Sequence, residues 1–366
     1  MGQVLSEPVT EKSSKEMSNS QWMVGSSSMQ GWRVSMEDAH THILTMEDDP
    51  AASFFAVYDG HGAATVAEYA GVDMHKRIVA QAQYRDGDIG GAMKAGYMSL
   101  DEEVLGCQER FGQAGSTAVS VLIRESKLYC ANVGDSRAVL SRTGKQIALT
   151  YDHKPSLEAE QDRITAAGGY VRFNRVNGGL AMTRALGDVT FKGNPSLAPD
   201  AQIVIAMPDI VTDEITEDDE FLVLACDGIW DVLSNQEVVD FVRDRISAKR
   251  MPVDICEELM THCLAPDCRI GGAGCDNMTV IIACMLHGGT FDDLAAKCAR
   301  SRPQTPPPQL PPRPTVVPGS GGAGWSSVDG GADPTTTTDS TTTTTTTTAD
   351  AADAADAGTA NTSIQS

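Results

Sequence analysis

Two sequences typical of buried strands end in an aspartate, a residue that needs a partner inside a protein core. In FFAVYDGHG (residues 54–62), five apolar or aromatic residues precede Asp59 and a Gly-His-Gly segment. In FLVLACDGIWD (residues 221–231), an apolar run leads into Asp227. Burying a carboxylate costs free energy unless a cation or hydrogen-bond donors compensate it. The pattern therefore indicates that these strands deliver acids to a functional site.

Acids from four segments could meet at one place if the strands end side by side. The segments RVSMEDAH, VYDGHG, ACDGIWD and GCDNMTV supply Glu37, Asp38, Asp59, Asp227, Asp231 and Asp276. At about 6 Å and an effective dielectric constant near 20, each like-charged pair costs roughly 2–3 kcal/mol, which divalent cations would relieve. Carboxylates without a cluster of His or Cys favour Mg²⁺ or Mn²⁺. Two such ions would neutralise four of the acids: Glu37, Asp59, Asp227 and Asp276.

Two divalent ions at these acids would supply hydrolytic chemistry. Ions about 3.5–4 Å apart can share a hydroxide and activate it for in-line attack on phosphorus. Gly60 and Gly228 fit this interpretation, because a residue without a Cβ lets carbonyls and waters approach a metal closely. Arg33, four residues before Glu37, offers a forked guanidinium for phosphate oxygens. His61 lies next to the acids, and an imidazole suits protonation of a leaving alkoxide near neutral pH.

Each of these residues also has an ordinary structural interpretation. Most of the 50 acids in the chain are expected on its solvated surface. Arg33 could pair with a surface acid, and His61 could be a core histidine at the end of a strand. The acid cluster could also be a structural calcium site, although it lacks the D-x-D-x-D spacing of an EF-hand loop. The residues alone leave these interpretations open.

The elements that must position the site are strands and helices in mixed order. Residues 54–58, 116–142 and 276–286 carry the Val-, Ile- and Tyr-rich runs of strands. SNQEVVDFVRDRI begins with Ser234 three residues before Glu237, which predicts a capping box ahead of an amphipathic helix. Runs of strands with separate helices predict an α+β layered domain.

Composition divides the chain into three parts. Residues 1–21 are predicted to be a flexible polar lead, and residues 22–290 the catalytic domain. Residues 291–366 are predicted to be an acidic tail, disordered from 303 onward, because its Pro, Gly, Thr and Ala offer little apolar surface to offset chain entropy. Within this tail, Pro308–Arg313 (PQLPPR) has the form of a polyproline II ligand for an SH3-type partner. It could equally be a plain stiff linker.

Bulk composition excludes some partners and restricts the compartment. The net charge of −22 argues against nucleic acid or an anionic membrane as an electrostatic partner. Nine cysteines without a framework spacing favour reduced thiols in the cytosol or nucleus. No apolar run approaches the ~18 residues of a membrane span, and no secretory signal begins the chain. Nothing in the sequence requires more than a monomer.

The first residues, MGQVLS, match an N-myristoylation pattern. Gly2 would be the acceptor after removal of Met1, and Ser6 stands at the favoured position. A single myristoyl chain gives only marginal binding, with an association constant of about 10⁴ per molar, and no nearby cysteine offers a second acyl site. The sequence therefore predicts a cytoplasmic protein with reversible, peripheral membrane association through Gly2. Matches this short also arise by chance.

Nine segments resemble those of one family, in the same order. They are RVSMEDAH, FFAVYDGHG, GSTAV, ANVGDSRAVL, DHKP, AGGYV, LAMTRALGD, VLACDGIWDV and GCDNMTVII, and they extend over about residues 22–286. The chain thus resembles the metal-dependent protein phosphatases of type 2C. The resemblance implies a central antiparallel β-sandwich flanked by helix pairs, in α-β-β-α layers, with a dinuclear Mn²⁺ or Mg²⁺ site at one end. It also implies a variable flap beside that site, at about residues 153–192.

The resemblance implies an activity and a ligand set. The activity is hydrolysis of phosphoserine and phosphothreonine in protein substrates by direct water attack, without a phosphoenzyme. Asp59 would bridge the two metals, with help from the Gly60 carbonyl. Asp227 and Asp276 would complete one metal and Glu37 the other.

The resemblance also gives roles to residues around the two metals. Arg33 would hold the phosphate, and His61 would act as general acid. Asp135 and Asp231 match positions associated with a weaker third metal. Asp38 matches a position that supports the ligands without itself binding metal.

A cysteine-dependent phosphatase is a competing hypothesis suggested by one literal motif. HCLAPDCR (residues 262–269) has the H-C-x₅-R form, with Cys263 as nucleophile and Arg269 as phosphate clamp. However, Pro266 has no N–H to offer an anion, and Asp267 would place negative charge where the phosphate must lie. The preceding segment also has the periodicity of a helix, whereas this mechanism needs a strand that leads into the loop.

Two further hypotheses assign the chain to different classes of protein. A non-catalytic scaffold with the same fold should have lost at least one key residue, yet none is missing among Arg33, Glu37, Asp59, Asp227 and Asp276. A two-metal phosphodiesterase or nuclease is disfavoured by the acidic folded part and by the lack of a basic groove.

Overall fold

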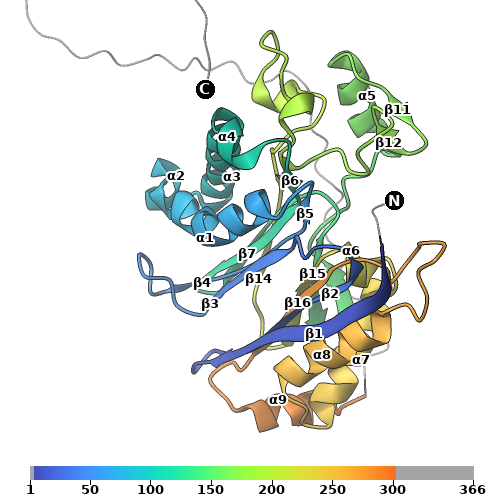
Figure 1. Ribbon diagram of the computed structural model, residues 1–366. Helices are drawn as coiled ribbons and strands as arrows, with labels where there is room; N and C mark the ends of the chain where they lie inside the picture. The colour runs from blue at the N-terminus through green and yellow to red at the C-terminus, as the bar shows by residue number, and fades with distance from the viewer. Residues whose placement is uncertain (1–3, 302–366) are drawn as a thin grey trace, which may run out of the picture. The chain divides into compact units, whose positions relative to one another are not determined.

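Two antiparallel β-sheets form the centre of the protein, in a computed structural model that describes residues 4–301 (Figure 1). The six-stranded sheet has the order β1 (Val4–Ser18), β2 (Trp22–Arg33), β16 (Met278–Met285), β15 (Asp219–Ala225), β9 (Arg137–Arg142) and β10 (Lys145–Ala148). The five-stranded sheet has the order β14 (Asp209–Glu214), β8 (Lys127–Val133), β7 (Ala118–Arg124), β4 (Ala52–Tyr58) and β3 (Ala39–Ile43). The sheets share one apolar core, so the predicted β-sandwich is confirmed.

The continuous apolar runs of the central strands reflect burial on both faces. In β4, Phe55 and Val57 belong to the core between the sheets, whereas Phe54 and Tyr58 belong to the core under the helices. Because side chains alternate along a strand, most residues of such a strand need an apolar side chain, and the acids that begin β15, Asp219 and Glu220, are paired with arginines. All seven residues of β4, and all seven of β15, are buried.

Helices cover the outer face of each sheet, which confirms the predicted α-β-β-α layers (Figure 1). The five-stranded sheet is covered by α1 (Thr65–Ala80) and α3 (Ile89–Gly106), joined by α2 (Ala82–Arg85) and followed by α4 (Gln108–Phe111). The six-stranded sheet is covered by α7 (Asn235–Ser247), α8 (Pro252–Cys263) and α9 (Phe291–Cys298). The predicted capping box begins α7: the Ser234 N–H donates to Glu237 Oε2 at 2.8 Å. No helix within residues 4–301 is long and apolar enough to cross a membrane.

Shorter elements extend one end of the sandwich. A small sheet joins β13 (Leu186–Gly187), β6 (Gly115–Ser116) and β5 (Gly60–His61). The flap contains α5 (Glu158–Ala166) and the hairpin of β11 (Val171–Arg172) and β12 (Arg175–Val176). Single 3₁₀ turns lie at Val189–Phe191 and Pro199–Ala201. The flap has a separate small core that includes Ile164 and Val176.

The prediction of a flexible lead over residues 1–21 is wrong for Val4–Ser18. This segment is β1, an edge strand that pairs with β2 from Val4 opposite Arg33 to Ser18 opposite Met23. Its polar residues suit an edge strand, because pairing uses the backbone and most of its side chains face solvent. Residues 1–3, with the acylation candidate Gly2, lie outside the described residues.

The predicted tail begins too early at residue 291. Phe291–Cys298 forms α9, whose Leu294 and Cys298 are buried against the six-stranded sheet. Arg243 also donates hydrogen bonds to the carbonyls of Lys297 (3.2 Å) and Arg300 (3.1 Å), which holds the end of α9. Eight residues are too short to show this packing from sequence pattern alone. The remaining tail from 302, with Pro308–Arg313, lies outside the described residues.

The expectation that the cysteines remain thiols is wrong for one pair. Cys268 and Cys275 form a disulfide in the loop after α8. This loop turns back on itself, with the Ala265 N–H donating to the Gly274 carbonyl at 3.0 Å, so cysteines seven residues apart meet. The indole of Trp32 packs against the pair. The other cysteines are free, and only Cys107 among them is exposed.

A buried ion pair connects the last helices to the six-stranded sheet and gives a stability test. Arg243 Nε lies 3.1 Å from Glu220 Oε1, and Glu220 is fully buried. Arg243→Ala would leave a buried carboxylate without its cation, so we expect the free energy of unfolding to fall by about 3–5 kcal/mol. Denaturant unfolding measures this loss. Arg250→Ala, which removes an exposed surface ion pair with Glu258, is the control and should leave the midpoint almost unchanged; equal losses in both variants would contradict the account.

Candidate active site

The predicted acids gather where β4, β15 and β16 end. Asp59 follows β4, Asp227 begins α6 (Asp227–Trp230) directly after β15, and Asp276 precedes β16. Burial raises the pKa of Asp59 well above its usual range, and the charges of Asp227, Asp38 and Asp276 raise it further. Such mutual effects require the carboxylates to lie close together. The sequence-based expectation that these segments meet is therefore matched by the geometry.

Two more acids extend the same cluster. Burial raises the pKa of Asp227 well above its usual range, and the negative charges of Asp135, Asp276 and Asp231 raise it further. The pKa of Asp231 is also raised, chiefly by burial, with a smaller contribution from Asp135. Asp135 and Asp231 thus lie beside the central acids, as the type 2C resemblance implied for a further metal position.

The cluster contains carboxylate oxygens that cations would satisfy. Both side-chain oxygens of Asp38, and Oδ1 of Asp135, are buried without a hydrogen-bond partner among residues 4–301. Burial raises the pKa of Asp38 to about 7, against the lowering effect of the nearby Thr279 and Cys226 side chains. Unsatisfied buried oxygens are costly, and carboxylates are the ligands that Mg²⁺ and Mn²⁺ prefer. The residues present therefore fit divalent cations.

Asp38 and Cys226 lie nearer the centre of the cluster than the sequence indicated. One ligand atom from each of Asp38, Asp59 and Cys226 lies within 4.8 Å of the others. The Cys226 sulfur accepts the Thr279 N–H at 3.1 Å, and burial raises the pKa of this thiol. Cys226 therefore acts here as a neutral neighbour of the acids. Its place directly before Asp227 was the only sequence signal for it.

The glycines beside the acids allow backbone segments to touch. A Cβ on Gly60 would collide with the Glu37 carbonyl oxygen, and a Cβ on Gly228 would collide with the Asn277 carbonyl oxygen. From the sequence, both glycines were explained by access for metal-bound groups. The structure instead gives them a direct steric role, which brings the segments carrying Glu37 and Asp276 against those carrying Asp59 and Asp227.

Asn277 fixes the loop that carries Arg33 and Glu37, a role that sequence reasoning missed. Its Nδ2 donates to the Gln30 carbonyl at 2.8 Å and to the Ser35 carbonyl at 2.9 Å. Its Oδ1 accepts the Glu37 N–H at 3.0 Å. The side chain is almost fully buried. The only sequence signal for this role was the position of Asn277 directly after Asp276, a predicted metal ligand, in GCDNMTV.

Arg33 lies at the open edge of the acid cluster. Its guanidinium contacts the Asp276 carboxylate, and its side chain is 38% exposed. Ser35 Oγ donates to Glu37 Oε1 at 2.9 Å on the same loop. Arg33 is thus held beside an acid of the cluster while it keeps access to solvent, as a residue that binds a substrate phosphate requires.

His61 is oriented by Asp188, a residue that sequence reasoning did not select. His61 Nε2 lies 2.8 Å from Asp188 Oδ2, and Nδ1 is buried without a partner among residues 4–301. Burial alone lowers the pKa of His61, but the hydrogen bond and charge of Asp188 outweigh it, so the pKa is raised. A Cβ on Gly115 would collide with both side chains. Asp188 ends the segment LAMTRALGD, but nothing in that segment indicated its role, because His61 lies 127 positions away in the sequence.

Both ends of the flap contact the site. Asp188 at one end reaches His61, and Lys154 at the other end forms an ion pair with Asp135. Burial lowers the pKa of Lys154, but the charge of Asp135 outweighs it and the pKa is raised. The neighbouring His153 accepts the Gly134 N–H through Nδ1 at 3.1 Å. The flap is thus anchored directly beside the acid cluster.

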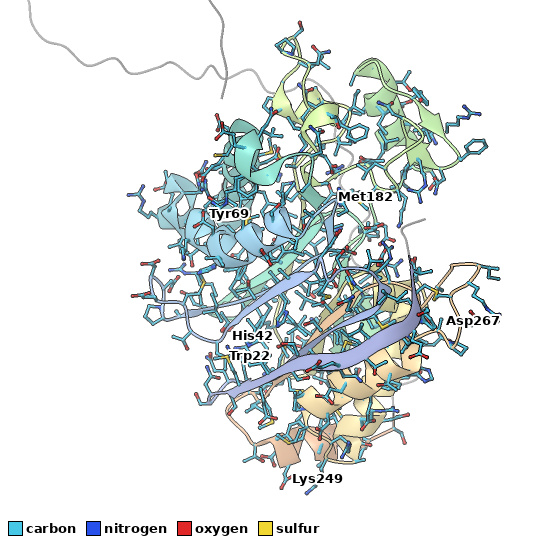
Figure 2. All side chains as sticks on the ribbon, in the orientation of Figure 1. Trp22, His42, Tyr69, Met182, Lys249 and Asp267 are labelled. Atoms are coloured by element: carbon cyan, nitrogen blue, oxygen red, sulfur yellow. A yellow bond between two sulfur atoms is a disulfide. The ribbon has the colours of Figure 1, made fainter. Side chains whose placement is uncertain are left out.

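The cysteine-dependent hypothesis does not fit the geometry. Cys263 is the last residue of α8 and is 2% exposed, and burial raises the pKa of its thiol to about 12. Arg269 Nε lies 2.8 Å from Asp267 Oδ2, an acid on the same loop. That loop projects at the edge of the protein, where Figure 2 labels Asp267. A buried, neutral thiol at a helix end cannot serve as an exposed nucleophile.

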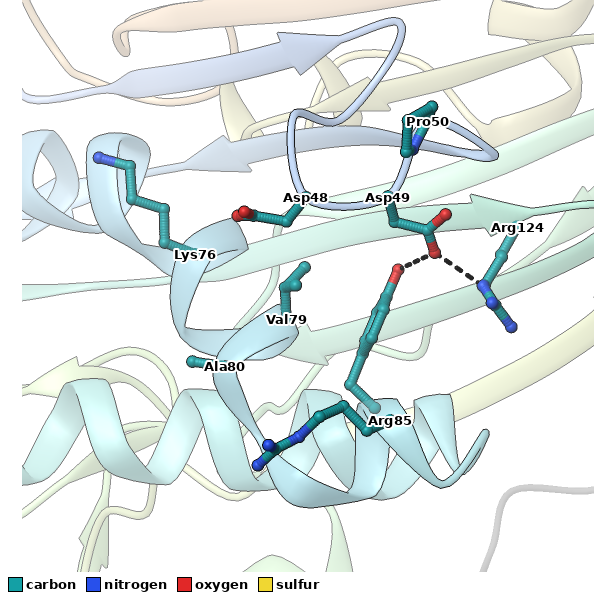
Figure 3. Close-up of a pocket in the computed structure, with 9 residues that line it drawn as sticks. Asp48, Asp49, Pro50, Lys76, Val79, Ala80, Arg85 and Arg124 are labelled. Carbon is teal, nitrogen blue, oxygen red and sulfur yellow. Dashed lines mark hydrogen bonds and ion pairs between the residues drawn. The ribbon is translucent and has the colours of Figure 1, made fainter.

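A cavity of about 650 Å³ lies apart from the acid cluster, and none of its lining residues belongs to the predicted site. Its charged groups include Asp49, which accepts hydrogen bonds from the Tyr84 hydroxyl (2.8 Å) and Arg124 Nε (2.7 Å) (Figure 3). These contacts join the loop before β4 to α2 and β7. The cavity is therefore best explained as part of the structural packing of that corner.

Comparison with known families and proteins agrees with this geometry. A family model described as protein phosphatase 2C matches residues 22–270. The chain belongs to the protein phosphatase 2C family. The resemblance seen in the nine sequence motifs is thereby confirmed, and the chain is a phosphoprotein phosphatase, a hydrolase.

Similar proteins are known from animals, fungi and protists. A probable protein phosphatase 2C of Caenorhabditis elegans is 56% identical over 301 residues, which cover 82% of this chain and 85% of that protein. Protein phosphatase 2C homolog 2 of Hypocrea jecorina is 47% identical over 322 residues, covering 84% and 74%. The crystal structure of serine-threonine phosphatase 2C from Toxoplasma gondii has a TM-score of 0.64 at 19% identity and covers 78% of this chain and all of that one. This last likeness confirms the fold.

The His61–Asp188 contact in this phosphatase 2C predicts a measurable titration. Because the pKa of His61 is higher in the folded state, the pair stabilises the metal-free fold at pH below about 6.5, the unfolded value. This stabilisation is lost as the pH rises through the folded-state pKa. In Asp188→Asn the charge is removed, so we expect the pKa of His61 to fall. NMR titration of the ring protons in EDTA-treated protein measures it; an unchanged pKa in the variant would contradict the assignment.

Proposed function

We propose that the chain hydrolyses phosphoserine and phosphothreonine in proteins with a centre of two Mn²⁺ or Mg²⁺ ions. Glu37, Asp59, Asp227, Asp276 and the Gly60 carbonyl would hold these ions. The observation that carries the proposal is the buried cluster of acids whose pKa values are raised by burial and by one another. The membership of the chain in the phosphatase 2C family supports the metal requirement, since the family is metal-dependent in general.

Divalent cations would offset the repulsion within this cluster. When bound, they neutralise the carboxylates and activate water for direct attack on phosphorus, without a phosphoenzyme. The acids alone would repel a phosphate dianion. The buried oxygens of Asp38 and Asp135 that have no partner among residues 4–301 support the presence of cations or of waters bound to them.

Arg33 is proposed to bind the substrate phosphate. A guanidinium donates two parallel N–H groups to a pair of phosphate oxygens, which fixes the orientation of the phosphoryl group. The contact of Arg33 with Asp276 supports this role, because it keeps the guanidinium next to a proposed metal ligand. Asn277 would act as a positioning residue through the backbone on either side of Arg33.

His61 is proposed to protonate the leaving serine or threonine oxygen. A protonated ring whose Nε2–H is directed at Asp188 has its second proton on Nδ1, which has no partner among residues 4–301. The raised pKa supports this role because it increases the protonated fraction near neutral pH. Asp188 would hold the ring in this orientation.

A weaker third cation is proposed at Asp135 and Asp231. Lys154 already pairs with Asp135, which supports weaker binding there, because a divalent cation would have to compete with the ammonium group. N-myristoylation of Gly2, with reversible membrane association, and an SH3-type partner for Pro308–Arg313 stay predictions. Both segments lie outside residues 4–301.

Phosphate release from a phosphothreonine peptide tests the proposed function. We expect turnover with Mn²⁺ or Mg²⁺ and none with EDTA. Asp59→Asn should lower kcat/KM by roughly 100-fold or more, the scale of losing one key electrostatic group. Cys263→Ser is the matched control and should retain full activity.

Two outcomes would contradict the proposal. Turnover that persists in EDTA and is abolished by Cys263→Ser would favour the cysteine-dependent mechanism. No turnover under any condition would favour the non-catalytic scaffold.

A further inference from the structure

A buried ion pair lies behind Asp188, the residue that contacts His61. Lys192 Nζ, on the segment after β13, lies 2.7 Å from Asp101 Oδ1 in the middle of α3. The two side chains are 2% and 4% exposed. Asp101 interrupts a helix face that also buries Tyr97 and Leu100. Because apolar side chains of similar volume often stabilise a core as well as a buried ion pair does, stability alone does not explain this one.

The ion pair holds the backbone on both sides of Asp188. Asp101 Oδ1 accepts the N–H of Gly187, the residue directly before Asp188, at 2.7 Å. Lys192 Nζ also donates to the Ala185 carbonyl at 2.7 Å. Asp101 and Lys192 therefore tie the chain before Asp188 and the chain after it to α3.

The backbone at Asp188 has a conformation that needs such support. Gly187 has φ of 75° and Asp188 has φ of 55°, so two successive residues lie in the left-handed region. A residue other than glycine is uncommon there, and it persists where its surroundings hold it. A Cβ on Gly187 would collide with the Ala114 carbonyl oxygen, which accepts the Asp188 N–H at 3.1 Å. Contacts with Ala114 and Asp101 thus fix the turn.

The geometry between this turn and His61 leaves little tolerance. Gly115 of β6 pairs with Gly187 of β13 and with His61 of β5. A Cβ on Gly115 would lie 2.4 Å from both Asp188 Oδ2 and His61 Nε2, so the two side chains meet directly over this glycine. Their contact is 2.8 Å long. A movement of the turn by about 1 Å would take it out of hydrogen-bond range.

We propose that Asp101 and Lys192 are positioning residues for the hydrolysis and act on His61 through Asp188. The inference rests on the proposed function, in which a proton moves from His61 to the serine or threonine oxygen as the P–O bond breaks. Asp101 holds the Gly187 N–H and so fixes the turn that directs the Asp188 carboxylate at the imidazole. Lys192 supplies the counter-charge that the buried carboxylate of Asp101 needs.

Two charge-neutral double variants separate the hydrogen bond to Gly187 from the charge of the pair. Asp101→Asn/Lys192→Met keeps an oxygen that can accept the Gly187 N–H. Asp101→Leu/Lys192→Met has a side chain of similar shape without an acceptor. The substrates are a phosphothreonine peptide, whose alkoxide leaving group needs a proton, and p-nitrophenyl phosphate, whose leaving group is stable as an anion.

The two variants should differ on the peptide alone. We expect the leucine variant to lose roughly 10- to 100-fold in kcat on the peptide, with KM unchanged, because a misplaced general acid forfeits part of its contribution. Its turnover of p-nitrophenyl phosphate should stay close to that of the wild type. The asparagine variant should restore most of the peptide activity.

A His61→Gln background tests whether the effect passes through His61. His61→Gln should itself lose peptide turnover selectively, and adding the leucine double substitution should cause no further selective loss, because the residue that it positions is gone. Arg243→Ala is the control, since it breaks a buried ion pair at Glu220, at the end of β15 opposite Asp227. It should leave the ratio of the two activities unchanged.

Thermal unfolding checks that each variant is folded, and Asp101→Ala/Lys192→Met, which also lacks an acceptor, replaces the leucine variant if that one does not fold. An unchanged ratio of the two activities, an equal loss on both substrates, or a further selective loss in the His61→Gln background would overturn the positioning role. Full selectivity in His61→Gln would overturn the proposed role of His61. A wild type inactive on both substrates with Mn²⁺ would overturn the proposed function itself.

Discussion

The repulsion among buried carboxylates is the constraint on which the rest of this structure depends. Asp59 and Asp227 lie at the ends of strands whose residues are all buried. The pKa values of both carboxyls are raised, because burial and the neighbouring acids disfavour their charged forms when no cation is bound. Folding must therefore hold together groups that favour separation. The double-layered sandwich can do so, because its two apolar faces fix the strand ends regardless of the charges placed there.

The surrounding contacts have a common purpose, which is to fix acids that repel one another. Contact between backbones at Gly60 and Gly228 brings the acid-bearing segments together, and the Asn277 side chain fixes the loop of Arg33. The flap adds one charged group from each of its ends, Lys154 to Asp135 and Asp188 to His61. The chain's own charged groups thus offset part of the negative charge of the acid cluster, and the proposed cations would offset the rest.

Sequence reasoning found the parts of the site whose signals are local. An apolar run that ends in an acid marks both a strand and its functional end, so Asp59 and Asp227 could be selected from short segments. Asp188 and Lys154 carry no local signal, because their roles depend on contacts with residues 127 and 19 positions away. The strand β1 was missed because an edge strand can be polar throughout, and α9 because it is short. The Cys268–Cys275 disulfide depends on a loop turn that spacing does not reveal.

The most direct test of this account is the thermal stability of the protein with EDTA and with added Mn²⁺, for wild type and Asp59→Asn. If the acid cluster repels itself and needs cations, Mn²⁺ should raise the midpoint of the wild type in proportion to its binding. Asp59→Asn should be more stable than wild type in EDTA, because one charge of the cluster is gone, and should respond less to Mn²⁺. A wild type indifferent to Mn²⁺, together with an Asp59→Asn variant less stable in EDTA, would contradict the central claim.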